Sequence, residues 1–256
     1  MNSHCLKCGL TESTFRKTGK FGCSSCIFVF LPESSFSRIS SDQIIKLRES
    51  ETALKPKHKF DWKNISFRVR ITRCLREGFF PYYSSEKGSI VSFLEKKGLA
   101  LQEGEFSESK GLETTSEQME RFYSNGEDHL RYEKIWKQDT FDGKKQGLDG
   151  KFLKILFEKG IWAWSPRIGF INSCPTNCGR GDRLSVQARL SPSDFSLASD
   201  YLTPFLGFGV EFTVLSDDRR DGSLSSVGVP TQISCKNGNP IQKRRFFKIL
   251  GLLGLA

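Results

Sequence analysis

Hydrophobic and polar residues alternate along residues 64–73. Ile65, Phe67, Val69 and Ile71 are separated by Ser66, Arg68, Arg70 and Thr72. This period of two predicts a β-strand with one apolar face and one polar face. The polar face would align Arg68 and Arg70, whose planar guanidinium groups bind phosphate oxygens bidentately. Taken alone, the segment also fits an ordinary strand whose polar face meets solvent.

Two further apolar segments flank a loop rich in proline and glycine. Residues 168–171 predict a strand that leads into the loop, and residues 184–190 predict the returning strand. The loop contains Cys174 and Cys178 and places Arg183 at the start of the second strand. This cysteine pair lacks the partners of a metal site, so metal binding is a poor explanation for it.

Residues 125–131 concentrate charged side chains. Glu127 and Asp128 are adjacent carboxylates, and His129 and Arg131 follow them. Such a group can perform acid–base chemistry or bind a cation, although, taken alone, a polar turn explains it better. Upstream, residues 31–60 are predicted to be a linker with a short helix over Gln43–Glu51 and a solvated basic spacer at 55–59.

Composition and charge exclude several classes of protein. The chain has 256 residues, 37% hydrophobic residues, a mean hydropathy of −0.39 and a net charge of +10. It lacks an apolar stretch long enough to span a bilayer and an apolar N-terminal signal, so we expect a cytoplasmic protein with no integral membrane segment. Residues 61–235 contain 24 basic and 24 acidic residues. Because the excess positive charge lies at the two ends, nucleic-acid binding is an unlikely main function.

The eight cysteines fall into two groups. Cys5, Cys8, Cys23 and Cys26 form two CxxC pairs in the first 26 residues, whereas the other four are scattered. Four thiolates at this spacing predict a closed, structural Zn²⁺ site, and a segment this short needs such a site in order to fold. The alternative is a pair of redox dithiols, which usually sit on a βαβ frame that the sequence does not show.

The cysteine-rich segment also resembles a known zinc finger. The similarity rests on CxxCG, on Thr11 and Phe15, on the run from Thr18 to Cys23, and on Phe30. On these residues it resembles the zinc-finger repeat of the activator protein that partners bacterial protein-arginine kinase. The resemblance implies protein partners of the stress-response protease and chaperone kind.

Three motifs of the remaining chain occur together in one family. These are SxRVRxxR at 66–73, NxEDHLR at 125–131, and GFxxSCPTNxG followed by Arg183. In this order they resemble the catalytic domain of the ATP:guanido phosphotransferases, which include the phosphagen kinases and, closest to this sequence, bacterial protein-arginine kinase. The resemblance covers roughly residues 61–237. It implies an α+β fold in which an open antiparallel sheet flanked by helices forms the ATP cleft.

The resemblance also implies a domain organisation. A four-cysteine zinc-finger module at 1–30 and a linker at 31–60 precede a shortened catalytic domain at 61–237. A basic and then apolar tail occupies 238–256, and its simplest interpretation is a helix packed on the sheet. A membrane-surface contact or a partner-docking segment is the alternative.

The family's functional residues map onto matching positions. Residues matching its ATP-binding arginines are Arg68, Arg70, Arg131 and Arg183. Glu127 matches the catalytic glutamate that orients and deprotonates the acceptor guanidinium, and Cys174 matches the cysteine near that group. The resemblance therefore implies ATP and Mg²⁺ as cosubstrate and cofactor, with a protein arginine as the acceptor. Charge neutralisation by fixed cations suits the metaphosphate-like transition state of phosphoryl transfer.

Several positions depart from the family. Gly126 replaces a glutamate, and Thr213 on the strand predicted at 208–214 replaces a further phosphate-binding arginine, for which Arg219 or Arg220 could substitute. The family continues with helices after the strand that matches Thr231–Ser234, whereas this sequence ends at Ala256. These departures leave an alternative: a degenerate relative with weak or no activity that acts as a zinc-dependent regulatory module.

Overall fold

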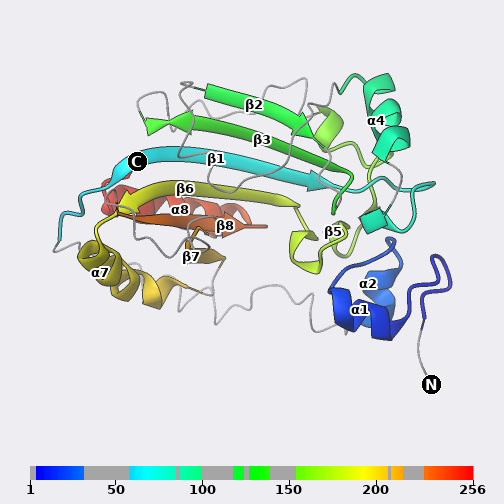
Figure 1. The fold of residues 1–256 in the computed structure, drawn as a ribbon, viewed down its shortest axis with the longest axis horizontal. Coiled ribbons are helices and arrows are strands. Elements are labelled where there is room, and N and C mark those ends of the chain that lie inside the picture. The colour runs from blue at the N-terminus through cyan, green and yellow to red at the C-terminus, as the bar shows by residue number, and fades with distance from the viewer. Residues whose placement is uncertain are drawn as a thin grey trace.

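The fold is built on a six-stranded antiparallel sheet with the strand order β2-β3-β1-β6-β8-β7. The computed structural model describes residues 4–31, 58–84, 87–99, 118–123, 127–138, 154–206, 209–215 and 228–255. Its strands are β1 (Lys63–Arg73), β2 (Gln118–Tyr123), β3 (Leu130–Lys137), β6 (Asp182–Leu190), β7 (Val210–Val214) and β8 (Val229–Lys236). The two longest strands, β1 and β6, pair at the centre of the sheet (Figure 1). The predicted α+β class with an open antiparallel sheet is confirmed.

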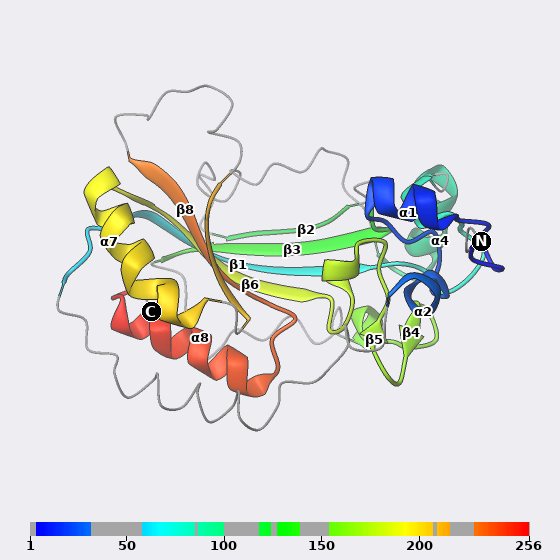
Figure 2. The same ribbon diagram turned by 90° about the horizontal axis from the view of Figure 1, so that it is seen from below.

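Helices cover one face of this sheet. α7 (Pro192–Leu202) begins at the N-cap Ser191, and α8 (Pro240–Leu252) begins at Asn239 with a capping box. Both helices lie on the same side of the strands (Figure 2). On α8, Phe246 and Ile249 are buried in one cluster with Phe67 of β1 and Val186 of β6. The C-terminal segment is therefore a helix packed on the sheet, as its simplest interpretation predicted.

A second cluster fills the end of the sheet next to α4 (Lys87–Lys96). Ile90 and Leu94 of this helix pack with Ile71 of β1, Tyr132 of β3 and the fully buried Trp162. The short strands β4 (Trp164–Ser165) and β5 (Gly169–Phe170) form a hairpin in this region. The strand predicted at 168–171 is therefore only two residues long.

The N-terminal finger docks beside this hairpin. It consists of α1 (Glu12–Thr18) and α2 (Cys26–Phe30) around the cysteine knuckles. The backbone N–H of Phe21 donates to the carbonyl of Ser173 at 2.7 Å, and the N–H of Tyr82 donates to the carbonyl of Gly22 at 2.9 Å. The finger cysteines share a buried cluster with Cys74 and Ile171. The finger thus packs directly on the loop that follows β5.

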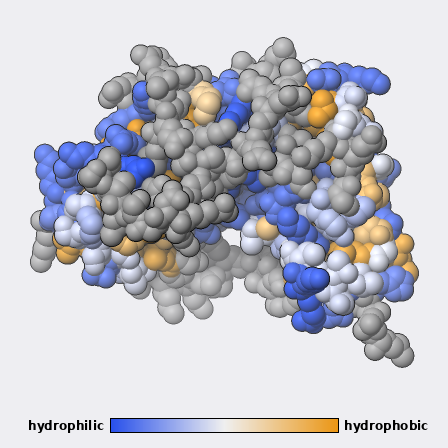
Figure 3. Space-filling model, in the orientation of Figure 1, coloured by the Kyte–Doolittle hydropathy of each residue, from blue (hydrophilic) through white to orange (hydrophobic). Residues whose placement is uncertain are grey.

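The described residues on the face drawn in Figure 3 are mainly hydrophilic. Hydrophobic side chains gather at the end where the finger and α4 lie (Figure 3), and Leu6, Phe28 and Val29 of the finger are exposed. Among the helices of the described ranges, none combines the length and the apolar character that crossing a bilayer requires. The linker helix predicted over Gln43–Glu51 lies outside the described residues.

Candidate active site and zinc site

The four finger cysteines come together as one cluster. Their Sγ atoms all lie within 4.8 Å of one another. The Sγ–Sγ distances are 3.6 Å for Cys5 and Cys23, 3.4 Å for Cys8 and Cys26, and 3.8 Å for Cys23 and Cys26. Four sulfurs about 2.3 Å from a tetrahedral Zn²⁺ would be about 3.8 Å apart. The predicted metal ligands therefore fit zinc, and a single cluster of four favours it over two separate dithiols.

The four predicted ATP-binding arginines lie on one face of the sheet. In the register, Arg70 of β1 stands opposite Arg183 of β6, and Thr72 of β1 stands opposite Arg131 of β3. Directly opposed residues of an antiparallel pair point to the same side, as do residues two apart along a strand. Arg68 shares this side because it lies two residues before Arg70. We call this side the polar face, and it is the face that α7 and α8 leave uncovered.

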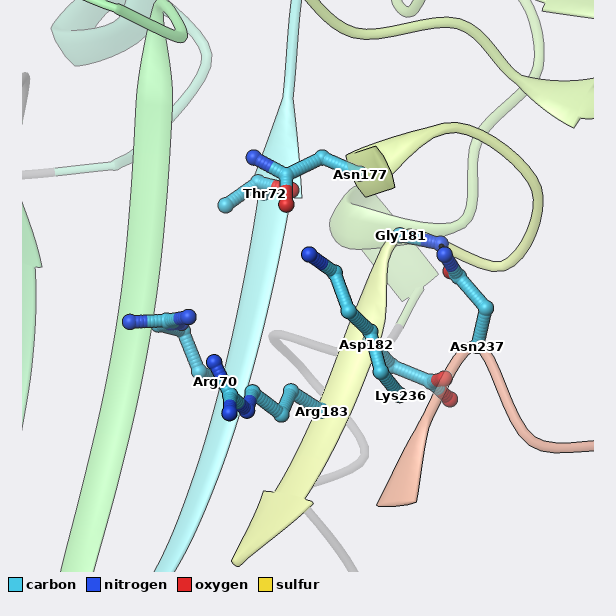
Figure 4. Close-up of a pocket in the computed structure, with 8 residues that line it drawn as sticks. All are labelled: Arg70, Thr72, Asn177, Gly181, Asp182, Arg183, Lys236 and Asn237. Atoms are coloured by element: carbon cyan, nitrogen blue, oxygen red, sulfur yellow. Dashed lines mark hydrogen bonds between the residues drawn. The ribbon is translucent and has the colours of Figure 1, made fainter. Parts of the chain in front are cut away.

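A small pocket lies at the end of the polar face. It is lined by Arg70, Thr72, Asn177, Gly181, Asp182, Arg183, Lys236 and Asn237. Figure 4 shows the cationic ends of Arg183 and Lys236 over β1, whereas the guanidinium of Arg70 extends from β1 toward β3. A pocket lined by three cations is a suitable site for an anion such as a phosphate group.

A buried carboxylate stands among these arginines. Glu133 of β3 lies opposite Arg70 in the register and is completely buried. One of its oxygens contacts the guanidinium of Arg68, and the other accepts from Nε and Nη2 of Arg121 at 3.0 and 2.5 Å. Arg121 comes from β2. Arg68, which the sequence assigned to ATP, is thus held by a carboxylate of the protein itself.

A second carboxylate of the polar face comes from the edge strand β7. Glu211 of β7 lies 3.1 Å from Nη2 of Arg183, which also donates to Ser234 at 2.9 Å. Glu211 is half exposed, with 48% of its side chain open to solvent. Its pairing with Arg183 is therefore weaker than the buried pairing of Glu133.

The predicted catalytic Glu127 stands at the border between the sheet and the finger. Its carboxylate lies 4.0 Å from Nη2 of Arg131 and 3.8 Å from Nζ of Lys20 in the finger. The side chain keeps 28% exposure, so an acceptor group from solvent can reach it. Glu127 is thus in direct contact with one of the four predicted arginines.

Asp128 connects the two motif loops. It is 1% exposed, and its two carboxylate oxygens accept from the backbone N–H of Ser173 at 2.9 Å and from Nδ2 of Asn177 at 2.8 Å. Burial, and secondly the charge of Glu127, raise the pKa of Asp128. These bonds place the loop that carries Cys174 next to Glu127. Asp128 is therefore a structural link between the loops.

His129 is a structural residue as well. Its Nδ1 accepts from the backbone N–H of Leu75 at 3.0 Å. Burial lowers the pKa of His129 to about 4. At neutral pH the ring is therefore uncharged and already engaged, which removes it as a candidate acid or base.

Cys174 precedes the 3₁₀ turn η4 (Pro175–Asn177) and is partly exposed. Its Sγ lies 3.0 Å from Oγ1 of Thr176, and that hydroxyl accepts from Nζ of Lys236 at 2.7 Å. Burial, and secondly the charge of Arg183, lower the pKa of Lys236. The thiol, the hydroxyl and the ammonium form a chain between the loop and the anion pocket.

The sequence reasoning missed Arg121, Glu133, Glu211 and Lys236. The sequence does hold one signal for two of them, which is the spacing of two residues that places side chains on the same face of a strand. Glu133 lies two residues after Arg131, and Lys236 lies two residues after Ser234. Arg121 and Glu211 join the face only through strand pairing. Thr213 of the edge strand β7 also lies on this face, opposite Gln232 of β8. Gly126, Arg219 and Arg220 lie outside the described residues.

The structure thus joins an antiparallel sheet, whose polar face carries arginines from three strands, to a docked four-cysteine finger. Residues 3–37 match the family described as McsA central zinc-finger domain. Residues 85–193 match the family described as ATP:guanido phosphotransferase, C-terminal catalytic domain. The resemblances to a zinc finger of this activator type and to the ATP:guanido phosphotransferase domain are thereby confirmed, and the matches support zinc binding and guanido phosphoryl transfer.

One solved structure supports the fold. A crystal structure of lombricine kinase has 16% sequence identity and a TM-score of 0.51, with 92% of this chain and 79% of that chain covered. Two structures of the duplicated taurocyamine kinase from Schistosoma mansoni are also similar, one substrate-free and one with bound transition state analog components. They have 17% and 16% identity and TM-scores of 0.47 and 0.48, and the chain covers 40% of each. No curated protein matches the chain.

Proposed function

We propose that this protein transfers a phosphoryl group from ATP to a guanidinium group, and that the acceptor is an arginine side chain of a protein. The observation that carries the proposal is the shared polar face. Arg68, Arg70, Arg131 and Arg183 come from three strands and lie on one side of the sheet, and Glu127 contacts Arg131 at its edge. The family matches to a guanido phosphotransferase domain and to a finger of the McsA type support both halves of the proposal.

In this mechanism the pocket of Arg70, Arg183 and Lys236 holds phosphate oxygens by charge-assisted hydrogen bonds. Glu127 orients the acceptor guanidinium and takes its proton, because a protonated guanidinium is a poor nucleophile. Cys174 lies on the loop that Asp128 fixes beside Glu127. Positioning and charge neutralisation are the main requirements of phosphoryl transfer. We assign Glu127 and Cys174 to the acceptor side on this basis.

Mg²⁺ is the proposed cofactor, and it supplies further neutralisation of the phosphate oxygens. The carboxylates described on the polar face, Glu133 and Glu211, are already engaged by arginines. A hard cation with oxygen ligands would therefore be held mainly through the phosphates and water. A cytoplasmic location and stress-response protease or chaperone partners remain predictions beside this proposal.

The test uses the full-length, zinc-loaded protein with ATP and Mg²⁺. The acceptors are an arginine-rich protein, free arginine, lombricine and taurocyamine, and mass spectrometry detects the phosphorylated guanidino group. We expect labelling of protein arginine, with a loss of about 10²–10⁴-fold in Glu127→Gln. Glu120→Gln, whose carboxylate lies on the opposite side of the sheet, is the matched control. Labelling of the small guanidines alone would refute the protein acceptor, and no labelling of any acceptor would refute catalysis.

A second candidate function follows from one observation, the buried contact of Arg68 with Glu133. Because an ATP-binding arginine is held by the protein itself, we also consider a weakly active relative that acts as a zinc-dependent regulatory module. Nucleotide binding with no detectable turnover, in the assay above, would select this function.

A further inference from the structure

Glu133 is the most deeply buried acidic residue of the polar face. Its side chain has 0% exposure, and its partners Arg68 and Arg121 have 3% and 12%. The carboxylate is shared between two guanidinium groups, one from the central strand β1 and one from the outer strand β2. An arrangement of this kind is fixed, because a buried charge cannot leave its partners without a large loss of interaction energy.

The position of this carboxylate is central to the proposed phosphate site. Glu133 stands opposite Arg70 in the β1–β3 register and two residues after Arg131. A carboxylate and a phosphate group engage the planar guanidinium fork in the same way, through two oxygens. Glu133 therefore occupies the guanidinium donors of Arg68 and Arg121, which a polyphosphate extending across the face would need.

We propose that Glu133 is an internal competitor of phosphate that determines which anions the polar face binds. Phosphate groups bind at the end of the face lined by Arg70, Arg183 and Lys236, and the Glu133 carboxylate holds Arg68 back from them. This inference rests on the proposed function, because it takes the polar face to be the phosphate site. It makes Glu133 a residue that sets specificity and affinity, with no part in the chemical step.

The charge balance gives the expected effect. A phosphate that binds Arg68 must displace the Glu133 carboxylate from the Arg68 guanidinium. It also lies close to the negative charge of Glu133. A neutral side chain of the same shape removes both effects at once. A single charge acting across a few ångströms of a partly buried site changes an affinity by roughly tenfold. We therefore expect Glu133→Gln to bind polyphosphates about tenfold more tightly.

The test measures binding of ATP and of inorganic pyrophosphate by isothermal titration calorimetry at constant ionic strength. Glu133→Gln is compared with Glu120→Gln, which removes the same charge from the other side of the sheet, where Glu120 accepts from the hydroxyl of Tyr132. Glu133→Asp keeps the charge and should keep the low affinity. Circular dichroism and zinc content verify folding, and Glu133→Thr, a small neutral residue suited to a strand, is the second variant if Glu133→Gln does not fold.

The outcomes separate this inference from the proposed function. Tighter binding of both anions by Glu133→Gln alone supports the inference. Wild-type binding of ATP with equal or weaker binding by the neutral variants overturns the inference and leaves the kinase proposal intact. If none of the proteins binds ATP, the kinase proposal fails. In that case a gain in pyrophosphate binding still supports the competitor, and the absence of a gain refutes it.

Discussion

Acid should destabilise this fold through one buried histidine. His129 is 1% exposed, its Nδ1 accepts from the backbone N–H of Leu75 at 3.0 Å, and its ring packs edge-on against Tyr82 at 5.2 Å. A proton on Nδ1 would face the N–H of Leu75 and would carry a charge into an apolar site. Burial accordingly lowers the pKa of His129 from 6.5 to about 4.

The sign and the size follow from proton linkage. Between pH 6.5 and about 4 the unfolded chain binds more protons at His129 than the folded chain does, so the free energy of unfolding falls as the pH falls. The contribution of His129 to the free energy of unfolding is complete above pH 6.5 and is lost as the pH falls through about 4. A shift of this size corresponds to about 3 kcal/mol.

The assay is urea unfolding at several pH values from 7 to 4, compared between the wild type and His129→Asn. Asparagine keeps an acceptor for the N–H of Leu75 but does not titrate, so the difference between the two curves isolates the histidine. This matters because the neighbouring Asp128, whose pKa is raised, acts with the opposite sign over part of the range. His58→Asn, a change at an exposed histidine, is the control. Parallel curves for the wild type and His129→Asn would refute the reasoning.

Three further predictions test the finger, the loop and the polar face. Gly22→Ala should weaken zinc binding, because its Cβ would lie 2.9 Å from Sγ of Cys8. Competition with a chromogenic chelator measures this, and wild-type affinity would contradict it. Asp128→Ala should lower the free energy of unfolding by about 2–5 kcal/mol, because two donors of the 173–177 loop lose their acceptor. A change below about 0.5 kcal/mol in urea unfolding, typical of surface substitutions, would show that this link is unimportant. Lys236→Met should weaken ATP binding roughly tenfold and reduce its salt dependence. Calorimetry at two salt concentrations tests this, and an unchanged salt dependence would exclude a phosphate contact.

Patterns within short segments predicted individual strands and the cysteine cluster. The alternation at 64–73 is confirmed as β1, the segment at 184–190 is confirmed within β6, and the segment at 208–214 contains β7. In each case the side-chain period of a strand is visible in the residues themselves. The cysteine cluster was predictable for the same reason, because CxxC spacing places two sulfurs on one knuckle.

Pairing between distant strands was not predictable in this way. β2 and β3 bring Arg121 and Glu133 into contact, although neither segment alternates clearly enough to be recognised as a strand. The docking of the finger depends on Phe21 and Ser173, which are 152 residues apart in the chain. Such contacts depend on the register and on the packing of elements, which a single sequence does not state.

The placement of charges on the polar face determines where phosphoryl transfer would occur. Two of the carboxylates that engage arginines there, Glu133 and Glu211, come from β3 and β7, on either side of the central strands. Between them, over β1 and β6, lies the pocket that Arg70, Arg183 and Lys236 line. The loop of Cys174 closes that end of the face, because Thr176 contacts Lys236 directly. Under the proposed function, the phosphate would thus lie at the end of the sheet that the loop of Cys174 and the docked finger share.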